Sequence, residues 1–262
     1  MMRNHLSYQE RAKLCSSLVA NRLFQLMEQK KTNLALSADV TTAQALLKLA
    51  DLLGPEICIL KTHIDIIEDF TPLLSQQLRY LADKHHFLLF EDRKFADIGH
   101  TVQQQYAGGI YHIARWADIV NAHCFPGPSV VQGLAAMATT QSALLLIAEM
   151  SSSDKVMSSI YLQQTIKMAE QFPDFVIGFI TQHALMAKPQ WINMIPGVNL
   201  TTEGDKLGQC YITPEEAIKK RGADVIIVGR GIIAADNPLN AAQMYREQGW
   251  RCYGERILKE FS

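Results

Sequence analysis

The sequence lacks several features that would assign it to a broad class of proteins. No apolar run approaches the roughly 20 residues that a membrane-spanning helix needs, and the first residues, MMRNHLSYQERAK, contain no apolar core of a signal peptide. The 25 Lys and Arg residues nearly balance the 26 Asp and Glu residues, so no excess charge would attract nucleic acid or a membrane surface. We expect a cytoplasmic protein with neither a nucleic-acid nor a membrane partner.

Cysteine is also scarce and irregularly spaced. None of the five cysteines belongs to a C-x-x-C pair or to another spacing typical of a metal site, and reduced thiols are the rule in the cytoplasm. The adjacent His123 and Cys124 would point to opposite faces of a strand, so they do not predict a shared metal. The cysteines therefore predict no metal site.

What the sequence does contain is a regular alternation of apolar and amphipathic stretches, with no low-complexity segment and no linker. The length of 262 residues fits one large barrel or two small domains, and the 48% of hydrophobic residues is enough for a sizeable core. An amphipathic helix is predicted over Ser7–Lys30, and eight strands follow. The predicted strands are Asn33–Val40, Glu56–Ile66, the start of Phe87–Thr101, Asp118–His123, Ala143–Met150, Phe175–Ile180, Trp191–Val198 and Asp224–Gly229.

A helix is predicted after each strand, and three of these helices carry a starting signal. Thr71-Pro72 places a capping hydroxyl before a proline, Thr213–Glu216 reads as a capping box, and Asn237-Pro238 begins a last helix that ends near Lys259. The other predicted helices are Thr42–Leu53, a segment through Arg115, Pro128–Ala138, a segment to Glu170, and a short or irregular one around Ala184–Lys188.

A pattern of strand followed by helix, repeated eight times, predicts an α/β protein with a (β/α)8 TIM barrel fold. We expect one domain over residues 1–262, with residues 1–31 as an additional helical segment packed on the barrel. A doubly wound open sheet is the alternative. Polar residues where the predicted strands end favour the barrel, because a closed ring brings all those ends to one mouth. They are Ser37, Asp39, Lys61, His63, Asp92, Lys94, Asn121, His123, Glu149, Ser151 and Arg230.

The most informative stretch is FLLFEDRKFADIGHT, residues Phe87–Thr101. A buried strand leads directly into charged residues, and side chains two apart on a strand share a face, so Asp92 and Lys94 would be neighbours. With Lys61 they would form a Lys–Asp–Lys array that keeps both amines protonated, and Asp97 is a possible fourth member. A solvated charged turn and a structural ion-pair network are the alternatives.

Two further groups of residues could bind hydroxyl groups and a phosphate. Ser37 and Asp39 could bind sugar hydroxyls, although Asp39 could instead cap the following helix. Gly229, Arg230 and Gly231 end the eighth strand, where backbone N–H groups and a guanidinium could converge on a phosphate together with the loop after the seventh strand. A tight turn with a solvated arginine is the alternative for Arg230.

These residues resemble the orotidine 5′-phosphate decarboxylase family. FEDRKFADIGHT, LSADV, LKTHIDI, IAEMSS and DVIIVGRGI match its motifs from Leu36 to Ile232, in the form of the fungal single-domain enzymes and of the decarboxylase half of uridine monophosphate synthase; we expect no transferase half. The resemblance implies decarboxylation of orotidine 5′-monophosphate to uridine 5′-monophosphate and CO₂, the last step of de novo pyrimidine biosynthesis, by a homodimer without metal or cofactor.

The resemblance also implies roles for individual residues. Lys94 would stabilise the charge at C6 and deliver the proton, Asp92 would lie beside the substrate carboxylate, and Lys61 would complete the array. Asp97, Ile98 and Thr101 are similar to residues that the family contributes across a dimer interface. The remaining implied substrate-binding residues are Ser37, Asp39, Thr62, His63, Ser151, Pro196, Gln209, Cys210, Tyr211, Gly229 and Arg230.

Two departures and two rival functions accompany this resemblance. Cys210 stands where the family usually has a second glutamine, and Ser153–Met157 replaces a glycine-containing segment. A magnesium-dependent sugar-phosphate lyase or decarboxylase on the same barrel also uses D-x-K-x-x-D, but there an acidic metal ligand stands at the position of Lys61. A nucleotide-binding sensor without turnover would need no charged array.

Overall fold

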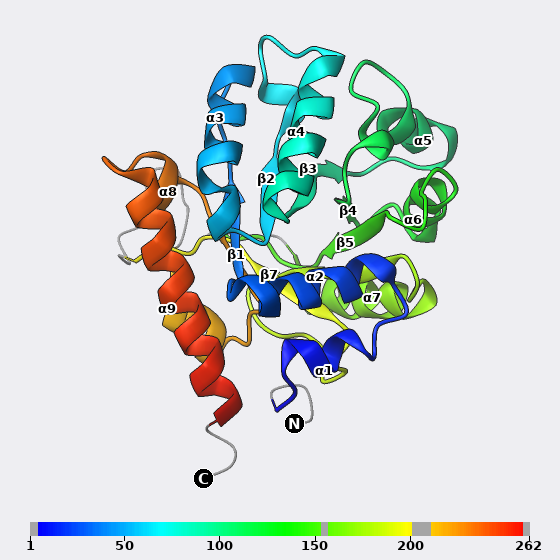
Figure 1. Ribbon diagram of the computed structural model, residues 1–262. Helices are drawn as coiled ribbons and strands as arrows, with labels where there is room; N and C mark the ends of the chain where they lie inside the picture. The colour runs from blue at the N-terminus through cyan, green and yellow to red at the C-terminus, as the bar shows by residue number, and fades with distance from the viewer. Residues whose placement is uncertain (1–4, 153–156, 201–210, 259–262) are drawn as a thin grey trace.

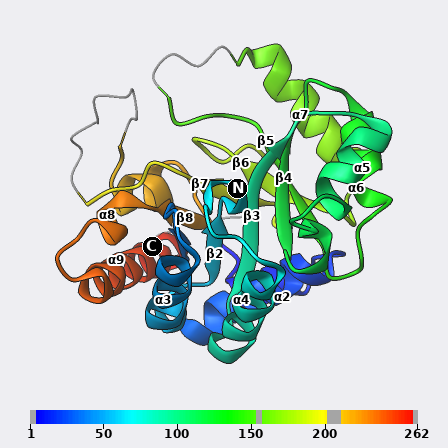
Figure 2. The same ribbon diagram turned by 90° about the horizontal axis from the view of Figure 1, so that it is seen from above.

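The computed structural model describes residues 5–152, 157–200 and 211–258, and in them the strands form a closed parallel barrel (Figures 1 and 2). The strand order around the barrel follows the chain, and β8 closes it by pairing with β1. The TIM barrel prediction is confirmed, and the open sheet is wrong. The strands are β1 Leu34–Ser37, β2 Ile59–Thr62, β3 Leu88–Phe95, β4 Ile119–His123, β5 Ala143–Ile147, β6 Val176–Ile180, β7 Ile192–Ile195 and β8 Val225–Val228.

Burial on both faces explains why the strands are continuous apolar runs. Every residue of β1, β2 and β5 to β8 is buried. Helices cover the outside of the ring (Figure 2), and the inside of such a barrel is filled by side chains. The exceptions are the second half of β3, where Asp92 to Lys94 are only half-buried, and His123 at the end of β4. Polar residues therefore enter the barrel wall at the carboxyl ends of these two strands.

Helices of very different length connect the strands. The α-helices are α3 Ala43–Leu53, α4 Pro72–His85, α5 Gly99–Ala107, α6 Pro128–Ala135, α7 Ser159–Gln171, α8 Arg230–Ile233 and α9 Pro238–Leu258. Shorter turns are the 3₁₀ segments η2 Gly54–Glu56, η3 Ile64–Ile66 and η4 Ile113–Arg115, and the π-helical η5 Glu216–Lys220. No helix among the described residues is long and apolar enough to cross a membrane.

Several predicted elements end earlier than expected. The helix over Ser7–Lys30 is divided into α1, Tyr8–Ala12, and α2, Leu18–Lys30, because the Ser17 hydroxyl accepts the N–H of Ala20 and starts a new helix. The helix through Arg115 stops at Ala107, before Gly108 and Gly109. The long second strand is only β2, with 3₁₀ turns on both sides. Residues 184–188 form no helix and connect β6 to β7 as an irregular segment.

The three starting signals had different outcomes. Asn237 accepts the N–H of Asn240 at 3.0 Å and caps α9 as predicted. Thr213 accepts the N–H of Glu216 at 3.2 Å, but the Glu216 carboxylate bonds to Arg221 at 2.6 Å instead of completing a capping box. Pro72 begins α4, whereas the Thr71 side chain makes no capping hydrogen bond. Lys259, the predicted end of α9, lies outside the described residues.

The N-terminal helices α1 and α2 close the amino end of the barrel (Figure 1). Arg11 is completely buried, and its guanidinium donates to both carboxylate oxygens of Asp224 at 2.6 and 3.2 Å and to the carbonyl of Trp191 at 3.0 Å. Its carbon Cζ lies 4.4 Å from the ring centre of Phe24. Because Trp191 and Asp224 immediately precede β7 and β8, Arg11 ties α1 to the base of two strands.

The C-terminal end of α2 makes a similar attachment through the ammonium group of Lys30. Lys30 Nζ donates to the carbonyl oxygens of Gly54, Ile57, His85 and His86, at 2.7, 2.6, 2.7 and 3.0 Å. These carbonyls belong to the segments that lead into β2 and β3. The ammonium group thus provides a donor for carbonyl oxygens of the kind that helix ends leave unpaired. α2 therefore links the base of the strands that carry the charged residues.

We predict that Arg11→Ala lowers the free energy of unfolding by roughly 3–5 kcal/mol, because it leaves the buried carboxylate of Asp224 without its main partner. Denaturant unfolding followed by circular dichroism measures this change. Arg251→Ala is the control, because its ion pair with Glu255 is exposed and long at 3.9 Å and should contribute little. Equal effects of the two substitutions would contradict the role given to Arg11.

Candidate active site

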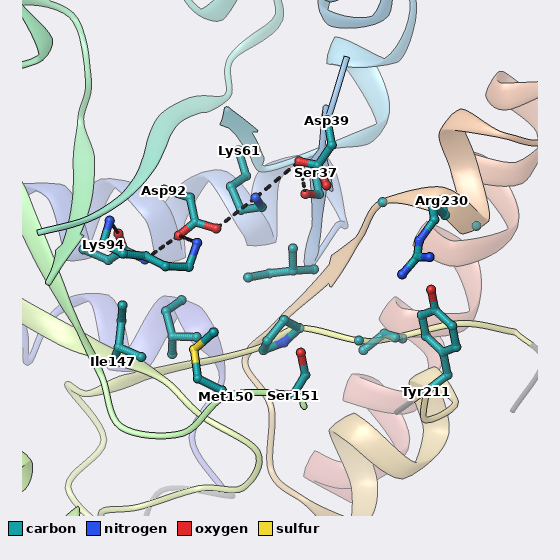
Figure 3. Close-up of a pocket in the computed structure, with 18 residues that line it drawn as sticks. Ser37, Asp39, Lys61, Asp92, Lys94, Ile147, Met150, Ser151, Tyr211 and Arg230 are labelled. Carbon is teal, nitrogen blue, oxygen red and sulfur yellow. Dashed lines mark hydrogen bonds and ion pairs between the residues drawn. The ribbon is translucent and has the colours of Figure 1, made fainter. Parts of the chain in front are cut away.

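One carboxylate lies between two ammonium groups at the carboxyl ends of β2 and β3 (Figure 3). Asp92 Oδ2 is 2.9 Å from Lys61 Nζ, and Asp92 Oδ1 is 2.7 Å from Lys94 Nζ. The side chains of Asp92 and Lys61 are only 12% and 6% exposed. The structure thus brings the Lys–Asp–Lys array together, and the alternative of a solvated charged turn is wrong.

The charge state of Asp92 follows from two opposing effects. Burial by itself would raise the pKa of Asp92, but the positive charges of Lys61 and Lys94 outweigh burial and hold this pKa well below its ordinary range. Asp92 is therefore ionised at neutral pH. The site contains a fixed negative charge with a cation on each side of it.

A second chain of contacts extends this array toward β1. The Ser37 hydroxyl donates to Asp39 Oδ1 at 2.8 Å, and the same oxygen lies 3.5 Å from Lys61 Nζ. His63 Nε2 is 2.8 Å from Lys61 Nζ, and burial, followed by the charge of Lys61, lowers the pKa of His63. The imidazole is therefore a neutral acceptor for the lysine. Thr42, not Asp39, caps α3, so the capping alternative for Asp39 is wrong.

The backbone at Lys94 departs from a regular strand. Its φ angle of 53° lies in the left-handed region, and the pairing of β3 with β4 shifts register between Glu91 and Phe95. Asn121 on β4 accepts the N–H of Lys94 at 2.7 Å and donates to Asp92 Oδ1 at 2.6 Å. Asp92 and Lys94 do meet, but through an irregular backbone rather than the simple alternation that the sequence predicted.

Arg230 and Tyr211 lie at the far end of the same cavity from Lys94 (Figure 3). Arg230 begins α8 directly after Gly229, it is exposed, and its Cζ lies 5.6 Å from the ring centre of Tyr211. Ile147, Met150 and Ser151 form another side of the cavity. The cavity therefore has a charged end and an arginine end with apolar surface between them, a shape that fits an elongated anion.

The predicted site residues fall into three groups. Those that line the cavity are Ser37, Asp39, Lys61, Asp92, Lys94, Ser151, Pro196, Tyr211, Gly229 and Arg230. Thr62 is buried behind the wall, where its hydroxyl donates to Glu91, and His63 reaches the array from the side through Lys61. Gln209 and Cys210, and most of the segment Ser153–Met157, lie outside the described residues.

Asp97, Ile98 and Thr101 are not among the described residues that line the cavity. Asp97 and Ile98 belong to the connection from β3 to α5, and Thr101 lies in the first turn of α5. Asp97 accepts the N–H of Ile98 at 2.8 Å, and Ile98 is 52% exposed. Within a single chain, this segment stands beside the site rather than in it.

Sequence reasoning missed several residues of the site. Asn121 carried a signal, because it stands at the end of a strand, but its partners were not evident. The missed apolar and glycine residues had no sequence signal for a role in the site, apart from their position near strand ends. Gly231 lines the cavity beside Arg230, as the predicted turn implied, and Asn121 was placed at the barrel mouth without a role. The lining residues that were missed are Ile147, Met150, Ile180, Gly197, Val198 and Ile227.

Glu91 was also missed, and it lies directly behind the array. It is completely buried, it accepts the Thr62 hydroxyl at 2.6 Å, and its two oxygens lie 3.0 and 3.2 Å from the N–H of Ile64. Burial raises the pKa of Glu91 to about 8, so its carboxyl group is largely neutral at pH 7. These bonds hold the end of β2, from which Lys61 and His63 project.

Comparison with known sequences is consistent with this geometry. The model of the Orotidine 5′-phosphate decarboxylase / HUMPS family matches residues 32–245. The chain is 51% identical over 260 residues to an orotidine 5′-phosphate decarboxylase of Rhizopus oryzae, covering 98% of both proteins. It is 51% identical over 254 residues to a uridine 5′-monophosphate synthase of Bos taurus, where 96% of the chain spans only 53% of the bovine protein.

Solved structures resemble the fold at much lower identity. An orotidine 5′-monophosphate decarboxylase of Methanocaldococcus jannaschii, in complex with the inhibitor BMP, aligns with a TM-score of 0.65 at 18% identity over 83% of this chain and 98% of that one. A decarboxylase of the same name from Sulfolobus solfataricus aligns with a TM-score of 0.61 at 20% identity over 84% and 99%. At this low sequence identity, the structural similarity supports the barrel fold alone.

We predict that Glu91 makes stability depend on pH. Its folded pKa is raised from 4.5 to about 8, so its contribution is fully present below the unfolded value and is lost as pH rises to about 8. Denaturant unfolding of the wild type and of Glu91→Gln between pH 4.5 and pH 9 isolates the effect: the wild type should lose stability relative to the variant as pH rises. Parallel curves would show that Glu91 does not titrate in this range.

Proposed function

The chain belongs to the orotidine 5′-phosphate decarboxylase / HUMPS family, and on that basis we propose that it converts orotidine 5′-monophosphate to uridine 5′-monophosphate and CO₂. The observation that carries the proposal is one cavity with the Lys61–Asp92–Lys94 array at one end and Arg230 at the other. Such a cavity suits a substrate whose reacting carboxylate and phosphate are far apart. In the cell this reaction completes the synthesis of the pyrimidine nucleotide.

In the proposed reaction, the bond between C6 of the pyrimidine and its carboxylate breaks, and the electron pair stays on C6 as CO₂ leaves. The ammonium group of Lys94 stabilises this charge and then transfers a proton to C6. The neutral amine regains a proton from water, so the overall change is loss of CO₂ and gain of one proton. Asp92 bonds to Lys94 at 2.7 Å, which supports this assignment because the carboxylate fixes the direction of the amine.

One cation is not sufficient for this reaction. A charge of opposite sign at about 4 Å contributes about 4 kcal/mol at an effective dielectric constant of about 20, whereas enzymes lower barriers by about 8–23 kcal/mol. The remainder must come from the preorganised array and from binding energy at the remote phosphate. Arg230, Tyr211 and the backbone at Gly229 are the groups we assign to the phosphate.

We infer that the reaction needs no metal. The carboxylate oxygens that could coordinate a cation are already bonded to side chains: Asp92 to Lys61 and Lys94, and Asp39 to Ser37. The Lys61 ammonium occupies the position where the related magnesium-dependent barrels place an acidic ligand. An ammonium group at this position opposes the binding of a divalent cation by like-charge repulsion.

We further propose that the working unit is a homodimer in which Asp97, Ile98 and Thr101 complete the site of the neighbouring chain. Two observations support this proposal. The cavity of one chain is formed without these residues, and the segment that carries them is exposed next to it, with Ile98 52% exposed. A partner chain would cover this apolar side chain.

Lys94→Ala should abolish CO₂ release while nucleotide still binds, because the substitution removes the cation at C6 and leaves the arginine end of the cavity intact. Trapping of CO₂ from carboxyl-labelled orotidine 5′-monophosphate measures turnover, and calorimetry with uridine 5′-monophosphate measures binding. We expect the wild type to release CO₂ equally well with and without a chelator.

Arg230→Ala is the matched control at the other end of the cavity. It should raise KM and lower kcat/KM, whereas Lys94→Ala acts on the chemical step. Normal turnover by Lys94→Ala would refute the assignment of the lysine, and loss of wild-type activity on chelation would favour a metal-dependent reaction.

A mixture of inactive Lys94→Ala and inactive Asp97→Ala chains should recover activity, because a mixed dimer contains one site with neither substitution. The measurement is CO₂ release after subunit exchange, with exchange verified by native mass spectrometry of differently tagged chains. Each variant incubated alone is the control. Absence of recovery after verified exchange would mean that each chain works with its own residues.

A further inference from the structure

We propose that Asn121 is a positioning residue that acts through Lys94 and Asp92, using both ends of its side-chain amide. The inference rests on the proposed function, because it concerns how the reacting amine is held. It adds a residue from β4 to an array that otherwise comes from β2 and β3.

The contacts of Asn121 form a closed ring with the two catalytic side chains. Its Oδ1 accepts the backbone N–H of Lys94 at 2.7 Å, and its Nδ2 donates to Asp92 Oδ1 at 2.6 Å. Lys94 Nζ donates to the same carboxylate oxygen at 2.7 Å. One amide therefore holds the main chain of the lysine and the partner of its ammonium group at the same time.

The orientation of the amide follows from its neighbours. If the oxygen and nitrogen of Asn121 were exchanged, the NH₂ group would face the N–H of Lys94 and the oxygen would face the carboxylate of Asp92. Both contacts would then be repulsive, because each would place two donors or two acceptors together. The ring of bonds is possible in one orientation only.

The backbone of Lys94 needs this support. A residue with a side chain is disfavoured at a φ angle of 53° and persists there only when its surroundings hold it. The register of β3 and β4 shifts between Glu91 and Phe95, so the regular ladder does not pair Lys94. The side chain of Asn121, which is only 1% exposed, takes the place of a ladder acceptor.

The charges around Asp92 explain why a neutral amide suits this position. Asp92 faces Lys61 from β2, His63 directly after β2, and Lys94 from its own strand. Buried Glu91 is beside it, and His123 is nearby on β4. A neutral donor adds a hydrogen bond without changing the balance of charge. A carboxylate at position 121 would still accept the N–H of Lys94 but would repel Asp92.

Two substitutions separate the two halves of the amide. Asn121→Ala removes both bonds, whereas Asn121→Asp keeps the acceptor for Lys94 and loses the donor to Asp92. We expect Asn121→Ala to lower kcat by about 100-fold, as misplacement of a reacting group by about 1 Å does, with a much smaller change in KM. Asn121→Asp should also lower kcat, because the second carboxylate repels Asp92 and displaces it from the Lys94 ammonium group, while the N–H of Lys94 keeps its acceptor.

Asn193→Ala is the matched control, since Asn193 is a completely buried asparagine on β7, next to Asp224 at the base of the barrel. It should lower stability without changing kcat at a temperature where circular dichroism shows every variant folded. A fall in kcat for Asn121→Ala no larger than for Asn193→Ala, or an unchanged kcat for Asn121→Asp, would overturn the proposal.

Hydrogen exchange at the backbone amide of Lys94, measured by NMR, tests the geometry without activity. Protection should be lost in Asn121→Ala and kept in Asn121→Asp. Unchanged protection in Asn121→Ala would overturn the proposal even if kcat falls. A wild type that releases no CO₂ would refute the proposed function, whereas the exchange pattern would still report whether Asn121 holds Lys94.

Discussion

The site depends on the carboxylate of Asp92, which remains ionised because two ammonium groups contact it in a buried position. Neither a lone carboxylate nor a lone amine would be stable there, since burial disfavours every isolated charge. Alternating charges offset that penalty and fix the side chains at once. The amine of Lys94 is thus directed before a substrate arrives, which is the condition for electrostatic stabilisation without reorganisation.

The barrel separates the part that stabilises the fold from the part that carries the chemistry. At its amino end, Arg11 attaches α1 to the bases of the strands through buried hydrogen bonds, and Lys30 attaches α2 through partly buried ones. The polar array occupies the carboxyl end, where the parallel strands leave space between their connecting segments. Strained or charged groups such as Lys94 can therefore persist because the rest of the structure is well packed.

The prediction of the strands succeeded and that of several helices failed for related reasons. A strand of this barrel is buried on both faces, so its apolar run is visible in the sequence. The break between α1 and α2, the missing helix at residues 184–188 and the unused cap at Thr71 depend on which hydrogen-bond partners lie nearby. For the break at Ser17 this partner is local, the N–H of Ala20, but apolar periodicity alone does not show where a hydroxyl group starts a new helix.

The sequence by itself determined the barrel and the identity of the charged residues, because strand periodicity and the spacing of Asp92 and Lys94 are local properties. Only the tertiary structure decided how these residues are held. The left-handed backbone of Lys94, the double contact of Asn121 and the neutral, buried Glu91 result from the packing of β2, β3 and β4 against one another. Burial and hydrogen bonding between distant residues set these properties, and a linear pattern does not encode them.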